Sequence, residues 1–322
     1  MSVRDQLRAV PDATIEPSDA VKRGIAHSLA YLDSDEAAAS LERDAYWPKW
    51  HSPWWHFTAL WECGEAHHAS SRAVARMVAA IDRIRLHTFP TTLAEMEPLP
   101  AHTDLSCHCA VGTMDQVLAA CGVDVPTALP WFTTWMREYQ MKDGGYNCDE
   151  RAYLEPVDEH GECPSSMTGT IAIFEALLAR PDRTLERAGE FLLARELWRG
   201  SPTKQNEHER TLEPLWLRPA FPRFYFYDVL RGLDAVSRWQ HAIPDAAIAH
   251  VVEHLVRTFP DGIIRVQRHP YDAHGTWAFV EGEWSRQPAT RFPLLDALSI
   301  KNAPHSYLTA EWRATRERLL QR

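Results

Sequence analysis

The sequence has no run of about 18 apolar residues, the length that a membrane-spanning helix requires, so no transmembrane segment is expected. It also has no basic tract, because 34 Lys and Arg residues are interspersed among 44 Asp and Glu residues, for a net charge of −10. Such a distribution argues against a nucleic acid as partner. The first residues contain no apolar stretch before Pro11, which predicts the absence of a signal peptide. We therefore expect a cytoplasmic, reducing location, in which the six cysteines are thiols or metal ligands and not disulfides.

Alternating patterns typical of strands are scarce as well, apart from the run Ile263–Val266. Apolar residues instead recur at intervals of three and four residues, as in the series Ala110, Met114, Val117 and Cys121. This spacing places one apolar stripe along a helix. The sequence therefore predicts a protein of the all-α class, and the 45% of hydrophobic residues supplies a sizeable core.

An internal repeat organises these helices. Five helical segments each place an acid directly after a large apolar residue, and the acids are 53, 60, 59 and 62 residues apart, at Glu62, Asp115, Glu175, Asp234 and Asp296. A period near 60 that holds two helices is typical of repeated helical hairpins. Small residues in the first helix of several hairpins suit a crowded inner layer. We predict an (α/α) toroid of five to six hairpins around a central cavity, built as one domain over residues 1–322 with residues 1–20 at its periphery.

The recurring acids have two interpretations. An acid at the same place in every hairpin is suited to bracing a neighbouring helix N-terminus or a Trp indole, which is a structural role. A catalytic role is the alternative. Because chemistry normally requires residues that differ between repeats, we expect the site residues where the repeat breaks.

Four of the six cysteines lie in the second and third hairpins, at Cys107, Cys109, Cys148 and Cys163. We expect them near the N-termini of inner helices, where the helix dipole favours thiolates. Three or four thiolates suit a tetrahedral zinc ion. Residues 107 and 109 face different ways on a helix, so both can bind one ion only if Cys107 precedes the helix. The alternative is that the cysteines are small buried residues that bind no metal.

A second set of candidates follows from position in the repeat. His56, Cys109 and Asp228 each stand six residues before a repeat acid, so they are equivalent positions that we expect near the cavity mouth. His56 and Asp228, together with Asp149 beside Cys148, are candidate catalytic acids or bases. The alternatives are a packed histidine at His56 and a solvated loop at Asp149.

The chain contains 13 tryptophans, which either pack between helices or line a cavity for a small, partly apolar substrate. An arginine near the start of an inner helix could hold a phosphate or carboxylate, although surface arginine is the ordinary interpretation. The residues that we predict to bind substrate are Trp54, Trp55, Tyr146, Tyr225, Tyr227 and Arg291.

The turn Asp143-Gly-Gly-Tyr-Asn147 and the helix Thr168-Gly-Thr-Ile-Ala-Ile-Phe-Glu-Ala-Leu177 resemble those of the squalene cyclase and protein prenyltransferase superfamily. The likeness to the superfamily covers most of residues 50–310 and implies an (α/α) toroid. The stretch from Pro130 to about Ala235 also resembles bacterial prenyltransferase or squalene-oxidase repeat proteins. The cyclases protonate an alkene with an acid in an Asp-x-Asp-Asp motif. The only similar string in this sequence, Asp33-Ser-Asp-Glu36, lies outside the repeats, so we do not assign alkene protonation to it. Prenyltransferases and lanthipeptide cyclases bind zinc through sets that include Cys and His, and Cys107-His108 is similar to part of such a set.

The function that we expect is therefore a zinc-assisted transferase, cyclase or hydrolase that acts on a small molecule in the central cavity. One alternative is a carbohydrate-active (α/α) barrel in which tryptophans stack on sugars and two carboxylates do the acid–base work. It predicts acids and aromatics in the cavity and the cysteines elsewhere. Another alternative is a binding or scaffold ring without catalysis, in which a metal only staples the fold.

Overall fold

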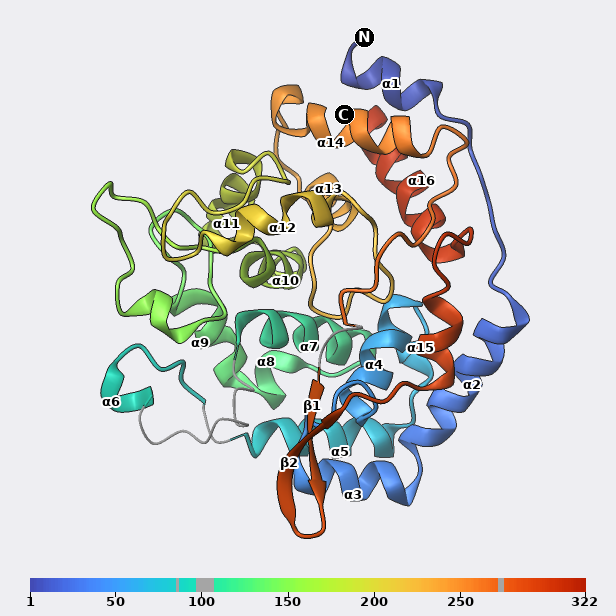
Figure 1. Cartoon of the computed structure of the whole chain (residues 1–322), viewed down its shortest axis with the longest axis vertical. Helices are drawn as coiled ribbons and strands as arrows, with labels where there is room; N and C mark the ends of the chain where they lie inside the picture. The colour runs from blue at the N-terminus through green and yellow to red at the C-terminus, as the bar shows by residue number, and fades with distance from the viewer. Residues whose placement is uncertain (85–86, 97–106, 272–274) are drawn as a thin grey trace.

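The computed structural model describes residues 1–84, 87–96, 107–271 and 275–322. Over these ranges the chain forms sixteen α-helices, two short 3-10 helices and one two-stranded antiparallel sheet (Figure 1). The prediction of a mostly helical protein is confirmed, and the small sheet is the exception to it. No helix in the described ranges is long and apolar enough to cross a membrane.

The helices are, in chain order, α1 (Val3–Ala9), α2 (Asp19–Leu32), α3 (Asp35–Arg43), α4 (Pro53–Glu62), α5 (Ser71–Asp82), α6 (Leu93–Met96), α7 (His108–Ala120), α8 (Val125–Ala128), α9 (Pro130–Glu138), α10 (Met167–Leu177), α11 (Arg183–Ala194), α12 (His208–Trp216), α13 (Val229–Arg238), α14 (Asp245–Thr258), α15 (Pro293–Leu298) and α16 (Ser306–Gln321). The 3-10 helices are η1 (Ala66–His68) and η2 (Glu150–Tyr153). The strands are β1 (Gly275–Val280) and β2 (Glu283–Pro288).

Local sequence explains where many helices begin. The side chains of Ser18, Ser34, Ser70 and Ser166 each accept a hydrogen bond from a backbone N–H in the first turn of α2, α3, α5 and α10. Such N-caps satisfy donors that have no partner within the helix. Helix α4 begins instead with Pro53, whose fixed φ suits the first helical position.

Successive contacts join the first helices of four predicted hairpins, and the last of these helices contacts α16. Helix α4 contacts α7, α7 contacts α10, α10 contacts α13, and α13 contacts α16. Helices α9, α11 and α14 pack against α7, α10 and α13 respectively, as second helices of hairpins. The centre of Figure 1 shows α7 beside α10. A Cβ added to Gly112 would lie 2.5 Å from the backbone of Ala172, so glycine lets these two helices approach closely.

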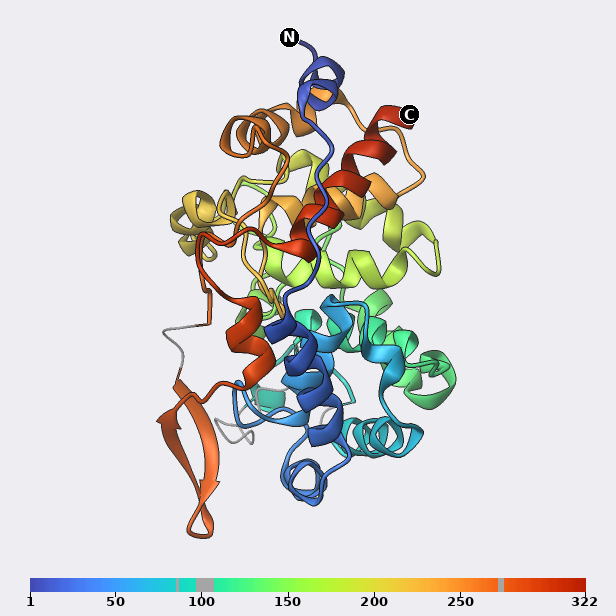
Figure 2. The ribbon, with the colours of Figure 1, turned by 90° about the vertical axis from the view of Figure 1, so that its right-hand side faces the viewer.

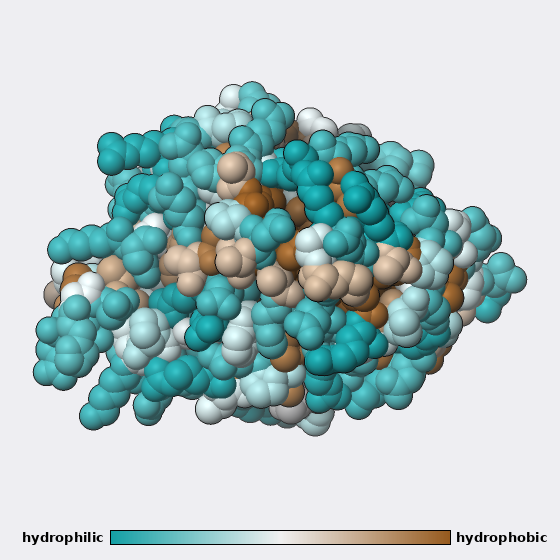
Figure 3. All heavy atoms as spheres, turned by 90° about the horizontal axis from the view of Figure 1, so that it is seen from above, coloured by the Kyte–Doolittle hydropathy of each residue, from teal (hydrophilic) through white to brown (hydrophobic). Residues whose placement is uncertain are grey.

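The buried apolar residues form one large cluster that runs from Val3 to Leu319. Helix α1 packs against α14 and α16, so both ends of the described chain lie at the same end of the molecule (Figures 1 and 2). The β1–β2 hairpin projects from the opposite end and carries the exposed residues Phe279 and Val280. Seen from above, the surface is mainly hydrophilic, with a band of apolar residues across its middle (Figure 3).

Candidate metal centre

Three of the four predicted cysteines come together in the structure. One sulfur from each of Cys107, Cys109 and Cys148 lies within 4.8 Å of the other two. The Sγ atoms of Cys107 and Cys109 are 3.1 Å apart, and the backbone N–H of Cys109 donates to Sγ of Cys148 at 3.4 Å. All three residues are free thiols, and two of them, Cys107 and Cys148, are half-buried. Side chains 39 residues apart in the sequence thus form one compact sulfur group, which we call the cysteine triad.

The N-terminus of α7 sets the position of two of these sulfurs. Cys107 is the N-cap residue and has extended backbone angles, with φ −126° and ψ 154°. Cys109 lies in the first turn of the helix. Cys107 therefore precedes the helix, which is the condition under which both side chains can face one ion.

The third sulfur is carried by the loop between α9 and η2. The backbone of Tyr146 anchors this loop to the start of α10, because Tyr146 accepts from the N–H of Ser166 at 2.7 Å and its own N–H donates to Oγ1 of Thr170 at 2.9 Å. His108 ties the loop to α7, since its Nδ1 lies 2.8 Å from the carbonyl oxygen of Asn147. A ring nitrogen that contacts a carbonyl must donate, so Nδ1 carries the proton. His108 thus holds Cys148 beside Cys107 without belonging to the triad.

The three thiols share protons unequally. Hydrogen bonds from the thiols of Cys109 and Cys148 hold the pKa of Cys107 well below its usual range. The same bonds raise the pKa values of Cys109 and Cys148, which keep their protons in order to donate them. The group therefore loses one proton readily and the others with difficulty. A metal ion that binds all three sulfurs would displace the remaining protons.

A cationic side chain that sequence reasoning did not find lies near the triad. The amine of Lys49 donates to the Tyr225 hydroxyl at 3.0 Å. It also lies 5.1–5.9 Å from the centres of five aromatic rings, those of Tyr46, Trp47, Trp50, Trp55 and Tyr225. Burial lowers the pKa of Lys49 to about 8, while the charges of Cys107 and Cys109 oppose this shift. A single lysine within the aromatic run Trp47–Trp55 is the sequence pattern that could have identified it.

Cys163 does not join the triad. Its side chain is buried in a separate small apolar cluster with Met141 and Ala152. The expectation of four converging cysteines therefore needs correction to three, because Cys163 is directed into apolar packing. This site matches the alternative of a small buried cysteine.

The candidate acids and bases lie in other surroundings. His56 is fully buried, stacks on Tyr31 and Phe292 with ring centres 4.2 and 3.9 Å away, and has a pKa that burial holds well below its usual value. Asp228 is fully buried, caps α13 and pairs with Arg223 at 2.8 Å. Asp149 is exposed and caps η2 by accepting from the N–H of Arg151 at 3.0 Å. Only Asp149, through its chain neighbour Cys148, stays next to the triad.

Most of the predicted substrate-binding residues pack in the core. Trp54 and Trp55 are buried, the hydroxyl of Tyr146 donates to the carbonyl of Met136, and that of Tyr227 donates to the carbonyl of Leu197 at 2.7 Å. Arg291 is exposed and pairs with Asp296 at 2.9 Å. Two of the predicted residues, Tyr225 and Trp55, lie beside Lys49, the triad's cationic neighbour.

The repeat acids divide into two groups. Asp115 pairs with Arg180 at 2.5 Å, and Asp296 forms an exposed pair with Arg291, five residues earlier in the chain. Both partners are arginines, whereas the structural interpretation named a helix N-terminus or a Trp indole. The other three, Glu62, Glu175 and Asp234, line one pocket of about 260 Å³.

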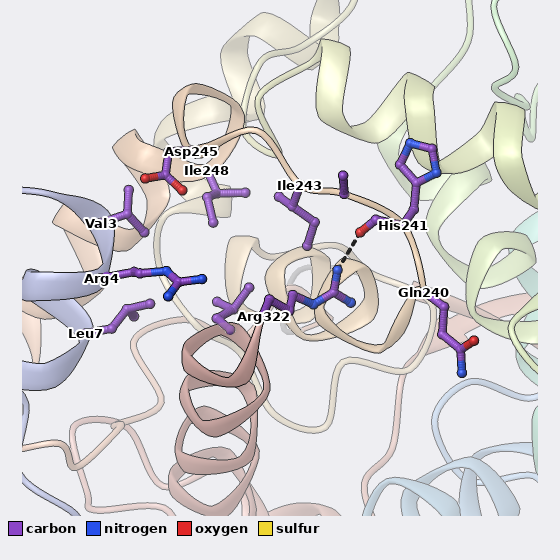
Figure 4. Close-up of a pocket in the computed structure, with 11 residues that line it drawn as sticks. Val3, Arg4, Leu7, Gln240, His241, Ile243, Asp245, Ile248 and Arg322 are labelled. Carbon is purple, nitrogen blue, oxygen red and sulfur yellow. Dashed lines mark hydrogen bonds between the residues drawn. The ribbon is translucent and has the colours of Figure 1, made fainter.

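A larger cavity of about 550 Å³ lies between α1, α14 and the end of α16 (Figure 4). Val3 and Leu7 from α1 face Ile243 and Ile248 across it, and Arg4 points into the space between them. The guanidinium of Arg322 is already used, because it donates to the carbonyl of His241. This cavity has an apolar floor and holds none of the predicted site residues.

No protein-family model, no curated protein and no solved structure matches this chain. The triad and its surroundings therefore carry the functional argument without support from a relative.

Proposed function

We propose that this protein is a zinc enzyme in which Cys107, Cys109 and Cys148 hold the ion. The observation that carries the proposal is the mutual approach of three sulfurs to within 4.8 Å. Thiolates are the preferred ligands of zinc, and one of these thiols already has a strongly lowered pKa. Structural zinc sites normally use four protein ligands, whereas catalytic sites use three and keep one position for water or substrate.

The charges near the triad fit this assignment. A Zn²⁺ ion with three thiolates has a net charge of −1, because 2 − 3 = −1, and the amine of Lys49 supplies the opposite charge nearby. When bound, the zinc would polarise a substrate oxygen or activate a bound thiol or water. Lys49 and Tyr225 would orient the substrate through their N–H and O–H groups, and the rings around Lys49 favour a small, partly apolar molecule.

We further propose that the helices form the (α/α) toroid implied by the resemblance to squalene cyclases and protein prenyltransferases. The chain of contacts from α4 through α7, α10 and α13 to α16 supports this arrangement. One pocket lined by residues from these same five helices supports it as well. Cysteines at the N-terminus of α7 would then lie at one mouth of the central cavity.

Metal analysis of protein purified without chelator or nickel tests the zinc assignment. We expect about one zinc per chain, which is lost in Cys107→Ser, Cys109→Ser and Cys148→Ser. Cys163→Ser is the matched control, because Cys163 is buried outside the triad, and it should keep its zinc. Absence of zinc from the natural sequence, or full retention in the triad variants, would refute the assignment.

Cobalt substitution distinguishes an enzyme from a scaffold that a metal merely staples. A three-cysteine site with an open position should change its visible cobalt spectrum when cyanide or a small thiol is added. A staple with four protein ligands should not respond to either addition. An unresponsive spectrum would favour the scaffold and overturn the catalytic role.

A further inference from the structure

Three of the repeat acids, Glu62, Glu175 and Asp234, line a pocket distinct from the triad. Glu62 ends α4 and Glu175 lies in the last turn of α10, so the pocket lies toward the C-terminal ends of these helices. Cys107, by contrast, stands at the N-terminus of α7. The segment before α13 separates the two places, because Arg223 lines the pocket while Tyr225 contacts Lys49.

Ion pairs hold the pocket's charges in fixed positions. Arg231 donates to Glu175 at 2.6 Å, and Arg223 donates to both oxygens of Glu311 at 2.8 Å. Glu175, Arg223 and Arg231 are each at least nine-tenths buried. These side chains are therefore preorganised before any ligand arrives, which lowers the entropic cost of binding.

The balance of charge excludes a simple ion site. Four carboxylates and three guanidinium groups line the pocket, so the formal net charge is 3 − 4 = −1. Two further groups, Asp228 behind Arg223 and Arg318 behind Asp234, cancel each other. A nearly neutral pocket with many oriented charges attracts neither cations nor anions strongly. It suits hydroxyl groups, which donate to carboxylates and accept from guanidinium groups at the same time.

Several polar atoms in the pocket have unused hydrogen-bonding capacity. The two oxygens of Glu62 accept from the N–H groups of Arg223 and Phe224 at 2.7 and 2.6 Å, which leaves a further lone pair on each oxygen. Burial raises the pKa of Glu62 to about 7, so near neutral pH this carboxyl can donate as well as accept. Arg238 pairs with Asp234 through Nε at 3.0 Å and lies 3.6 Å from Glu175 through one terminal nitrogen; its side chain is 38% exposed, so the remaining terminal N–H groups can reach a ligand.

Two aromatic residues, Trp61 and Phe221, complete the lining. An aromatic ring beside carboxylates and guanidinium groups provides an apolar face for the C–H side of a sugar ring. The volume of about 260 Å³ lies below the usual range for small-molecule pockets, roughly 300–1,000 Å³, and limits the ligand to a single ring.

We infer that this pocket binds one small polyhydroxylated molecule of monosaccharide size. Glu62, Glu311 and Arg238 hydrogen-bond its hydroxyl groups, and Trp61 contacts its C–H face. The site is separate from the cysteine triad and does not depend on a metal ion.

Saturation-transfer NMR and calorimetric titration with D-glucose, D-galactose, D-mannose and myo-inositol test the inference on the full chain. We expect saturable binding of at least one of these probes. Trp61→Leu and Arg238→Gln should each weaken it by roughly tenfold or more. Trp284→Leu on the projecting hairpin and Arg257→Gln on α14 are matched controls that should leave binding unchanged. Thermal unfolding of each variant verifies that the fold is intact.

Three results would overturn the inference: no saturable binding of any of the four polyols, equal binding in the pocket variants, or preferential binding of tetramethylammonium or inorganic phosphate. The double variant Cys107→Ser/Cys148→Ser separates this proposal from the zinc assignment. It should lose zinc and still bind the polyol, so either proposal can fail without the other.

Discussion

Replacing His108 with Phe tests the account of how the triad is assembled. The substitution keeps an aromatic ring in a shell made by Phe89, Trp135 and Tyr153 but removes the N–H that His108 donates to Asn147 at 2.8 Å. A buried acceptor left without its donor costs about 1–3 kcal/mol, and we expect the free energy of unfolding to fall by that amount. Zinc affinity should fall by about 10–100-fold, the usual effect of removing a group that orients a metal ligand.

The assays are urea unfolding and competition for zinc with a chelator of known affinity. His305→Phe is a matched control, because His305 is also buried and accepts a backbone N–H, that of Leu308, far from the triad. It should lower stability without changing zinc affinity in the folded protein. Burial lowers the pKa of His108 to about 4, so the effect of His108→Phe should be the same at pH 6 and pH 8. Unchanged zinc affinity would refute the positioning role, and complete loss of zinc would make His108 a ligand.

The other predictions concern packing, a buried ion pair and proton release. Gly112→Ala should lower the free energy of unfolding by about 1–3 kcal/mol, because its Cβ would lie 2.5 Å from the backbone of Ala172. Gly275→Ala is the control, because its Cβ would make only ordinary contacts, and it should leave stability nearly unchanged. Thermal or urea unfolding measures both. Asp228→Asn should cost about 1–3 kcal/mol because it removes one of the two carboxylates that pair with Arg223, while Glu311 remains. Burial acts to raise the pKa of Asp228, but Arg223 outweighs burial and the pKa lies below its usual value. The stability from this pair is therefore present above about pH 4 and is lost as the pH falls through the folded-state pKa. Urea unfolding between pH 3 and pH 7 should show a smaller loss of stability at acid pH in Asp228→Asn. Zinc binding should release two protons, from Cys109 and Cys148. Zinc affinity measured by chelator competition should therefore fall by about 100-fold when the pH is lowered by one unit near neutrality. Zinc affinity that does not change with pH would contradict the proton sharing.

The helical class was readable from the sequence because helical periodicity is a local property. The repeat acids marked the ends or middles of α4, α7, α10, α13 and α15, and their spacing located successive hairpins. The same residues did not reveal that Glu62, Glu175 and Asp234 share a pocket, because that depends on how hairpins lie beside one another.

The β1–β2 hairpin was not predicted, although a local pattern for it exists. Aromatic residues alternate with other residues at Trp277 and Phe279, and Glu281-Gly282 forms a turn in which both residues have positive φ, 52° and 89°. Such a turn favours a two-residue hairpin connection. The run Ile263–Val266, which looked most like a strand, lies outside the two-stranded sheet.

The candidate site was predictable in part. Composition and position in the hairpins pointed to Cys107, Cys109 and Cys148, because thiols near helix N-termini are expected to be reactive. The exclusion of Cys163, the aromatic shell of Lys49 and the role of His108 depend on the path of the loop around Asn147, which no spacing rule encodes.

X-ray absorption at the zinc edge of the natural protein, purified without chelator, is the most direct test of the central claim. The account predicts one zinc with three sulfur ligands at about 2.3 Å and one nitrogen or oxygen ligand at about 2.0–2.1 Å. A first shell of four sulfurs would contradict the open position, and a shell without sulfur would contradict the cysteine triad as the metal site.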